Sequence, residues 1–387
     1  MLALLAHRFG DLDLADECVQ DALVAAAAWT TVPANPAGWL YTVAYHRAID
    51  RLRRAAAERR RLQAASYLLA LPTEEEPDMV VEHSDVGDEH LRLVLLCCHP
   101  ALDRDAQVAL TLRLVGGLTT AEIAAAYLVP EPTLAQRIVR AKRKIRDAGI
   151  PLSIPASLDE RVDTVLAVLY LIYNEGYLSR SSQGARVDLV DEAIRLTSAV
   201  ASLVPGNAEA LGLLALELYG RARTSSRFAG GELVLLEHQD RTMWDAAGIE
   251  QANRALSAAL ALAVPGAFQL QAWIASHHAN ARTAAETDWS AIASAYGQLL
   301  ALTPSPVVAL NRAVAVAMAD GAPAGLALLD GITGLDEYHL YWAARGELLA
   351  RSGDPDAAAP AFRRARALAT NPAEQRHLDR RIAAVSP

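Results

Sequence analysis

TTAEIAAAYLVPEPTLAQRIVRAKRKIRDAG, the stretch from Thr119 to Gly149, contains both lysines of a 387-residue chain whose formal net charge is −9. Thr119 and Glu122 have the spacing of a capping box, in which each residue satisfies a free backbone N–H at the start of a helix. After the turn YLVP, Glu131 and Pro132 open a second helix, because a first-turn proline lacks only an N–H that had no partner. The pattern predicts two helices joined by a short turn.

The second helix combines an apolar stripe with a basic face. Leu134, Ile138, Ala141 and Ile145 recur at spacings of four, three and four, so we expect them to be buried. The polar residues project elsewhere, which suits a helix-turn-helix whose second helix contacts base edges and phosphates in the major groove. A solvated basic helix in an ordinary bundle explains this helix equally well. The candidate DNA contacts are Thr133, Gln136, Arg137, Arg140, Lys142, Arg143 and Lys144.

The composition predicts an all-α protein of several domains. Hydrophobic residues make up 52% of the chain, and alanine and leucine, both strong helix formers, dominate it. A chain of this length usually divides into two to four domains. Three cysteines give no disulfide framework, as is typical of a reducing cytoplasm. No apolar run approaches the ~20 residues that span a bilayer, so we expect a cytoplasmic protein without membrane contact.

Charge segregation marks the joints between domains. Residues 47–61 are strongly basic, residues 74–89 are acidic without any lysine or arginine, and residues 148–157 form a proline-containing hinge. An acidic stretch of this kind is usually a solvated linker. The predicted segments are a first domain at 1–62, a linker at 63–88, a helix-turn-helix domain at 89–149, a helical extension at 150–255 and helical repeats at 256–387.

The C-terminal part has a weak internal period. Residues 307–332 and 341–368 both have the pattern of a helix, a glycine-containing turn and a helix, with Gly321 and Gly353 at matching points. Their separation is close to the ~34-residue period of tetratricopeptide repeats. Each helix pair is too small to bury its apolar face alone, so we expect the pairs to stack into a solenoid-like, tetratricopeptide-like domain.

An acidic helix and a basic helix are predicted near the N-terminus. Residues 10–29 have an apolar face and an acidic stripe, which comprises Asp13, Asp16, Glu17, Gln20 and Asp21. A short loop leads to Asn35 and Pro36, which are expected to cap and start the next helix. On that helix Trp39, Leu40 and Val43 are expected to face inward, while Arg47, Arg51 and Arg54 fall on one side. Neighbouring helices of opposite charge imply two surfaces for two partners.

The two blocks DLADECVQDAL…WLYTVAYHRAIDRLRR and LTTAEIAAAYLVPEPTLAQRIVRAKRKIR resemble regions 2 and 4 of the extracytoplasmic-function sigma factors of bacterial RNA polymerase. The resemblance covers residues 1 to about 150, and the order of the blocks also matches. The continuation, YLIYNEGYLSRSS at 170–182 and LVLLEHQDRTMWDAA at 233–247, is similar to the subgroup with a helical, tetratricopeptide-like C-terminal extension.

The resemblance implies a role for each surface. The acidic helix would bind the coiled coil of the polymerase β′ subunit, region 4 would meet the β flap and the −35 element, and region 2 would capture a base flipped from the −10 strand. Extruding that base costs a few kcal/mol, which a pocket with a basic flank must offset. The implied core-polymerase contacts are Asp16, Glu17, Gln20 and Asp21. The implied −10 contacts are Asn35, Trp39, Arg47, Arg51 and Arg54.

No catalytic constellation stands out, and we expect neither an enzyme, nor a cofactor, nor a metal. Cys97, Cys98 and His99 lie together in an apolar helix, where adjacent cysteines cannot both reach one tetrahedral ion, so a buried structural role is favoured. The polar set of YNEGY (173–177) with Arg221, Arg223, Arg227, Asp240 and Arg241 suits either salt-bridged helix ends, the favoured interpretation, or a pocket for a regulatory ligand or protein.

Two functions from different classes remain. The first is a sigma factor that directs core polymerase to promoters, with its extension controlling that activity. The alternative is a stand-alone helix-turn-helix regulator with a ligand- or protein-sensing repeat domain. The acidic helix at 13–21 and the basic helix at 47–54 have no use in the regulator, which favours the first.

Overall fold

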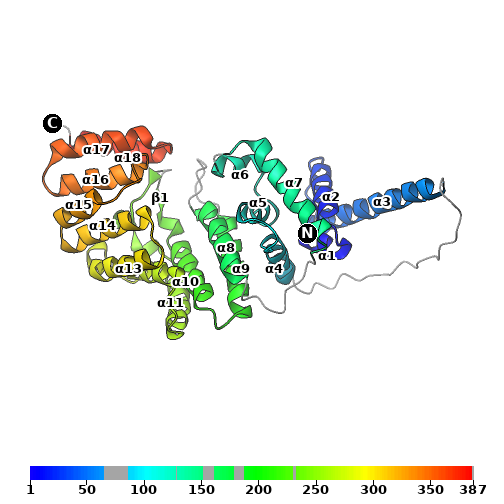
Figure 1. The fold of residues 1–387 in the computed structure, drawn as a ribbon, viewed down its shortest axis with the longest axis horizontal. Helices are drawn as coiled ribbons and strands as arrows, with labels where there is room; N and C mark the ends of the chain where they lie inside the picture. The colour runs from blue at the N-terminus through cyan, green and yellow to red at the C-terminus, as the bar shows by residue number, and fades with distance from the viewer. Residues whose placement is uncertain (65–85, 128, 151–160, 178–186, 230–231, 386–387) are drawn as a thin grey trace. The chain divides into compact units, whose positions relative to one another are not determined.

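The computed structural model describes the chain except residues 65–85, 128, 151–160, 178–186, 230–231 and 386–387 (Figure 1). The described residues form two compact units, Met1–Val168 and Leu169–Pro387. Both are built from helices, which confirms the predicted all-α class. The exception is a pair of two-residue antiparallel strands, β1 (Phe228–Ala229) and β2 (Glu232–Leu233). Within the described residues no helix is long and apolar enough to cross a bilayer.

The first unit begins with α1 (Leu2–Phe9), α2 (Leu12–Ala26) and α3 (Pro36–Ala64). Asp11 caps α2 by accepting a hydrogen bond from the Leu14 backbone N–H at 3.0 Å. Asn35 does the same for α3 through the Gly38 N–H at 2.9 Å, as predicted. The helix pair α2–α3 packs through small buried residues, namely Ala15, Cys18 and Ala22 of α2 with Ala44 and Ala48 of α3.

The face of α3 that packs inward therefore differs from the predicted face by part of a helical turn. Trp39, Leu40 and Val43 are only half-buried, whereas Ala44 and Ala48 are fully enclosed. Alanine side chains let two helix backbones approach closely, so the seam follows the small residues rather than the large apolar ones.

The helix-turn-helix follows in α4 (Val86–Cys97), α5 (Arg104–Leu114), α6 (Thr120–Tyr127) and α7 (Glu131–Asp147). The capping box is present: the Thr119 N–H donates to the Glu122 carboxylate at 2.7 Å, and the Glu122 N–H donates to the Thr119 hydroxyl at 3.2 Å. The predicted stripe of α7 is buried against α5 and α6, which confirms it; its members are Leu134, Ile138, Ala141 and Ile145.

The predicted linker lies mostly outside the described residues. Its positions 65–85 are not described, and neither are residues 151–157 of the predicted hinge. The flanking helices reach into the predicted linker, since α3 runs to Ala64 and α4 starts at Val86. The domain boundaries from the sequence remain a prediction.

The second unit stacks helices in chain order. They are the end of α8 (Val162–Tyr177), then α9 (Val187–Leu203), α10 (Ala208–Ala222), α11 (Ala246–Ala261), α12 (Ala267–Ala279), α13 (Trp289–Leu302), α14 (Pro306–Asp320), α15 (Ala322–Asp330), α16 (His339–Arg351), α17 (Pro355–Leu368) and α18 (Pro372–Val385). From α9 to α18 each described helix contacts the next one, with α11 placed beside both α10 and α12 (Figure 1). Gly321 and Gly353 adopt positive φ angles at the turns where the repeat pattern placed them.

The segment between α10 and α11 is an extended excursion rather than a tight turn. It contains β1, β2 and the short 3₁₀ turns Thr224–Ser226, Leu236–His238 and Arg241–Met243. Two hydrogen bonds hold it: in a buried one the Trp244 indole N–H donates to the Ser226 hydroxyl at 2.7 Å, and in a partly buried one the Arg241 guanidinium donates to the backbone carbonyl of Ala281 at 2.8 Å. Ser226, Gln239 and Trp244 thus anchor a segment whose other residues are mostly exposed or half-buried.

Candidate functional site

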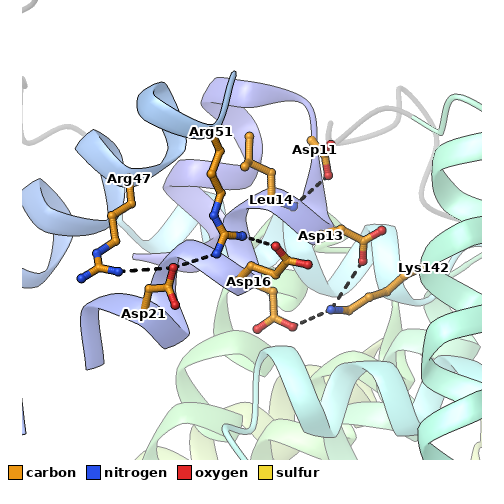
Figure 2. A network of polar contacts seen from close by, with 9 residues as sticks. Asp11, Asp13, Leu14, Asp16, Asp21, Arg47, Arg51 and Lys142 are labelled. Carbon is orange, nitrogen blue, oxygen red and sulfur yellow. Dashed lines mark hydrogen bonds and ion pairs between the residues drawn. The ribbon is translucent and has the colours of Figure 1, made fainter. Parts of the chain in front are cut away.

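The acidic residues predicted on the first amphipathic helix all lie on α2 (Figure 2). They differ in accessibility, because the Glu17 side chain is 65% exposed whereas the Asp16 side chain is only 14% exposed. Gln20 is exposed as well. The polar face of α2 is thus open at Glu17 and Gln20 and covered at Asp16.

Arginines of α3 cover one edge of this face. Arg51 donates to the Asp21 carboxylate at 2.8 Å and also binds Glu17, and Arg47 lies 3.5 Å from the same Asp21 carboxylate. Arg54, by contrast, is exposed and forms no ion pair with a described residue. Two of the three arginines predicted on one side of α3 therefore bind the acidic helix.

The other predicted −10 residues have local structural roles. The Asn35 side chain caps α3. Trp39 packs edge-on against Trp29, with ring centroids 4.9 Å apart. The structure places these two beside the loop before α3, at a distance along the helix from Arg51 and Arg54, so the five candidates do not form one continuous exposed patch.

Cations of α7 cover the other edge of the acidic face (Figure 2). The Lys142 ammonium lies 2.5 Å from the Asp16 carboxylate and 3.7 Å from that of Asp13. One turn further along, Arg146 donates to Asp13 at 2.7 Å. Lys142, predicted to contact DNA, is thus ion-paired with Asp16, predicted to contact polymerase.

Most of the remaining candidate DNA contacts lie on an outward face of α7. These exposed residues are Thr133, Gln136, Arg140, Arg143 and Lys144. Arg140 donates to Gln136 at 3.2 Å, which orients both side chains on that face. Arg137 is the exception, because its guanidinium pairs with Asp105 of α5 at 3.1 Å. The recognition helix therefore has one face toward α2 and another that is open.

The burial of each ion pair determines how much the pair contributes to the stability of the folded chain. Exposed pairs such as Arg143–Asp147 contribute about 0–1 kcal/mol each, since water screens them and their side chains lose entropy. Lys142 and Asp16 are only 11% and 14% exposed, so the loss of either partner leaves a largely desolvated charge. The Lys142–Asp16 pair is therefore the most consequential contact between α7 and α2.

The sequence did not single out the apolar part of the α2 surface. Val24 is 74% exposed and Leu23 is 46% exposed, and both lie within about one turn after Gln20 and Asp21 on the helix. The available signal was the position of Val24, which lies outside the buried stripe and four residues after Gln20. An exposed apolar end beside an acidic face is typical of a protein-binding surface.

The two cysteines of the cysteine-histidine cluster are enclosed in the first unit. Cys97 and Cys98 are buried and unbonded to each other, as predicted, and burial raises the pKa of the Cys98 thiol to about 12. Among the described residues no group of histidine, cysteine, aspartate and glutamate side chains could hold a metal ion.

Comparison with known proteins matches these two helical regions to defined families. Residues 1–58 match the family model of sigma-70 region 2, and residues 92–145 match that of sigma-70 region 4. The ECF RNA polymerase sigma factor SigK of Mycobacterium ulcerans is 28% identical over 148 residues, which cover 37% of this chain and 76% of SigK. The chain therefore contains sigma-70 regions 2 and 4 and is a distant homologue of an extracytoplasmic-function sigma factor.

The part of the chain that follows these two regions has a family match of its own. Residues 161–260 match a family of unknown function, DUF6596. An uncharacterized protein of Rhizobium meliloti (strain 1021) is 40% identical over 396 residues, which cover 98% of this chain and 91% of that protein. The similarity to that protein therefore extends over both sigma regions and the second unit of this chain.

Sigma factors are not enzymes, and sigma domains imply binding to core RNA polymerase and promoter DNA. The two faces described above, the acidic face of α2 and the outward face of α7, lie within the residues that match regions 2 and 4.

Proposed function

We propose that this sigma factor directs core RNA polymerase to specific promoters by binding the β′ coiled coil through α2 and the −35 element through α7. The observation that carries the proposal is the pair of exposed faces within the two sigma regions. One is the open part of α2, with Glu17 and Gln20 beside the exposed apolar Leu23 and Val24, and the other is polar and basic on a helix-turn-helix. Charge complementarity to a basic coiled coil and to the phosphate backbone supports the two assignments.

The −10 contact is proposed for the loop before α3 and the basic end of that helix. Residues 30–32 and 34–35 are exposed, as is Arg54, whereas Arg47 and Arg51 are bound to α2. We expect Arg54 to neutralise phosphate in the complex. Region 4 is proposed to meet the β flap, and the helical extension is proposed to control the activity of the two sigma regions.

Run-off transcription with purified core polymerase on genomic fragments tests the sigma assignment. Specific transcripts that require both core and the full chain would support it. Tight, specific binding of the protein alone to duplex DNA, without any core-dependent transcript, would favour a stand-alone helix-turn-helix regulator instead. Comparing the full chain with one truncated after Val168 then separates an activating extension, whose loss abolishes transcripts, from an inhibitory one, whose loss increases them.

Gln20→Lys is expected to lower core-dependent transcription about tenfold or more, because it places a cation opposite the basic partner of α2. Gln20 is exposed and outside the ion pairs of the α2 face, so the variant leaves the contacts with α3 and α7 intact. Asp50→Asn changes the net charge by the same amount at an exposed position on α3 and is the control. Equal activity of the two variants would argue against α2 as the polymerase-binding helix.

Arg140→Ala and Arg143→Ala are expected to affect promoter binding in different ways. If Arg140 contacts a base edge, its loss weakens one promoter position by about 1–3 kcal/mol and relaxes specificity there. If Arg143 contacts phosphate, its loss weakens binding to every sequence alike and lowers the salt slope by about one. Binding of the polymerase complex to −35 variants at several salt concentrations measures both. The opposite pattern would exchange the two roles.

A further inference from the structure

A small cavity in the second unit lies between the last turns of α8 and the end of α10. Its volume is about 230 Å³. Tyr170, Tyr173, Asn174 and Tyr177 of α8 line one side at helical spacing, and α10 contributes Tyr219 and Gly220, with Arg223 directly after the helix. This volume is below the ~300–1,000 Å³ of drug-sized ligand pockets, so it suits a small molecule.

The aromatic wall of the cavity is held in place by packing. Tyr173 and Tyr177 stack with ring centroids 5.4 Å apart and an angle of 14° between their planes. Tyr173 is only 4% exposed, and its hydroxyl occupies the space in which a Cβ at position 220 would lie. Gly220 therefore permits the close approach of α8 that forms the wall.

Two polar groups of the cavity lack hydrogen-bond partners. The Asn174 amide forms no hydrogen bond with any described residue. The Arg223 Nε is buried and likewise finds no acceptor within the described part of the chain. The rest of that guanidinium is held, because it donates to the Tyr177 hydroxyl at 2.8 Å and lies 5.8 Å from the Trp244 ring centroid. An amide and a fixed guanidinium with free donors thus both line the aromatic cavity.

The electrostatic surroundings favour an anion. None of the residues lining the cavity carries a carboxylate. Burial is the main cause of the lowered pKa values of Arg227 and Arg241. The nearby positive charge of Arg223 lowers both pKa values further. Glu217, near Tyr173, is fully buried and does not line the cavity, and burial raises its pKa well above the usual range, which favours its uncharged form.

We propose that this cavity binds a small planar organic carboxylate, with Arg223 and Asn174 holding its two oxygens and the tyrosines enclosing its apolar body. Guanidinium N–H groups pair well with carboxylate oxygens, and the aromatic faces suit a flat ring. Among the polar residues predicted for a C-terminal pocket, Tyr173, Asn174, Tyr177 and Arg223 meet here. Arg221 lies elsewhere, because its guanidinium pairs with Asp191 at 2.6 Å. The cavity would give the extension a ligand, independently of how the sigma regions bind polymerase.

Isothermal titration and thermal shift of the full-length chain test the proposal with benzoate, 4-hydroxybenzoate and nicotinate as probes. Benzamide is the matched neutral probe, and inorganic phosphate is the anion without a planar body. We expect at least one aromatic carboxylate to bind, with benzamide and phosphate about tenfold weaker or worse, since a charge-assisted hydrogen bond contributes about 1.5–3 kcal/mol.

Arg223→Gln and Arg221→Gln form a matched pair that removes the same charge two residues apart. Only Arg223→Gln should weaken binding, by about tenfold or more. Should Arg223→Gln lower the melting temperature, Asn174→Asp serves in its place, because it retains shape and adds a repelling charge at a half-buried position. Equal binding of benzoate and benzamide, equal loss in Arg221→Gln and Arg223→Gln, or no binding of any carboxylate up to about 10 mM would overturn the proposal.

Discussion

Replacing Lys142 with glutamate is expected to raise the affinity of this protein for core polymerase by about tenfold, equivalent to ~1.4 kcal/mol. In the free chain Lys142 holds α7 on α2 through Asp16 and Asp13, and Asp16 is one of the proposed polymerase contacts. Binding of α2 to polymerase must therefore break this pair. Glutamate at position 142 would repel both aspartates. The free energy of breaking the pair would then no longer be lost when α2 binds polymerase.

Lys144→Glu is the matched control, because Lys144 is the second lysine of the chain and lies on the exposed face of the same helix. The two variants carry equal net charge, so general electrostatic steering cancels in the comparison. The double variant Asp16→Lys with Lys142→Glu restores attraction between α2 and α7 and should bind core poorly. Fluorescence titration of core polymerase measures all three. Core affinity in Lys142→Glu no higher than in Lys144→Glu would show that the contact does not compete with polymerase.

Replacing Glu217 with glutamine is expected to stabilise the second unit at pH 8 by roughly 1–3 kcal/mol while leaving it near wild type at pH 5. Glu217 on α10 is fully buried, and neither carboxylate oxygen has a hydrogen-bond partner within the described residues. Burial raises the pKa of this carboxyl well above its usual 4.5. Glutamine keeps the shape of the protonated acid and cannot ionise.

The direction in which folding stability changes with pH follows from proton linkage. The folded state holds the Glu217 proton to a higher pH than the unfolded state does, so its contribution to stability is fully present below about pH 4.5 and declines as pH rises toward the folded pKa. Melting curves between pH 5 and pH 8 should therefore diverge between wild type and Glu217→Gln. Glu250→Gln, on the exposed face of α11, is the control and should follow wild type. Parallel curves for wild type and Glu217→Gln would contradict the assignment of a buried, protonated acid.

The sequence was informative where structure is set by neighbouring residues. The capping box at Thr119 and the buried stripe of α7 depend on residues three or four apart, and both are present as predicted. The side of α3 that faces inward was less predictable. It was assigned to large apolar residues such as Trp39, whereas the seam follows Ala44 and Ala48, because close approach of two helices favours small side chains.

No local sequence pattern could predict that the two candidate surfaces pair with each other. Lys142 and Asp16 are 126 positions apart, and Arg146 and Asp13 are 133 positions apart. The charges of both helices were visible in the sequence, and two external partners were the natural explanation for them. Which charges meet depends on how the two sigma regions pack, and the segment that joins them carries no periodic signal to indicate it.

The chain-order packing of the second unit also affects how it folds during synthesis. From α9 onward each described helix contacts its successor, so most contacts close short loops at low entropic cost. Such a stack can form from its N-terminal side while later helices are still being made by the ribosome. The strand β2 is different, because it contacts α18 near the C-terminus. The excursion between α10 and α11 therefore reaches its full set of contacts only after the last helix of the chain has been made.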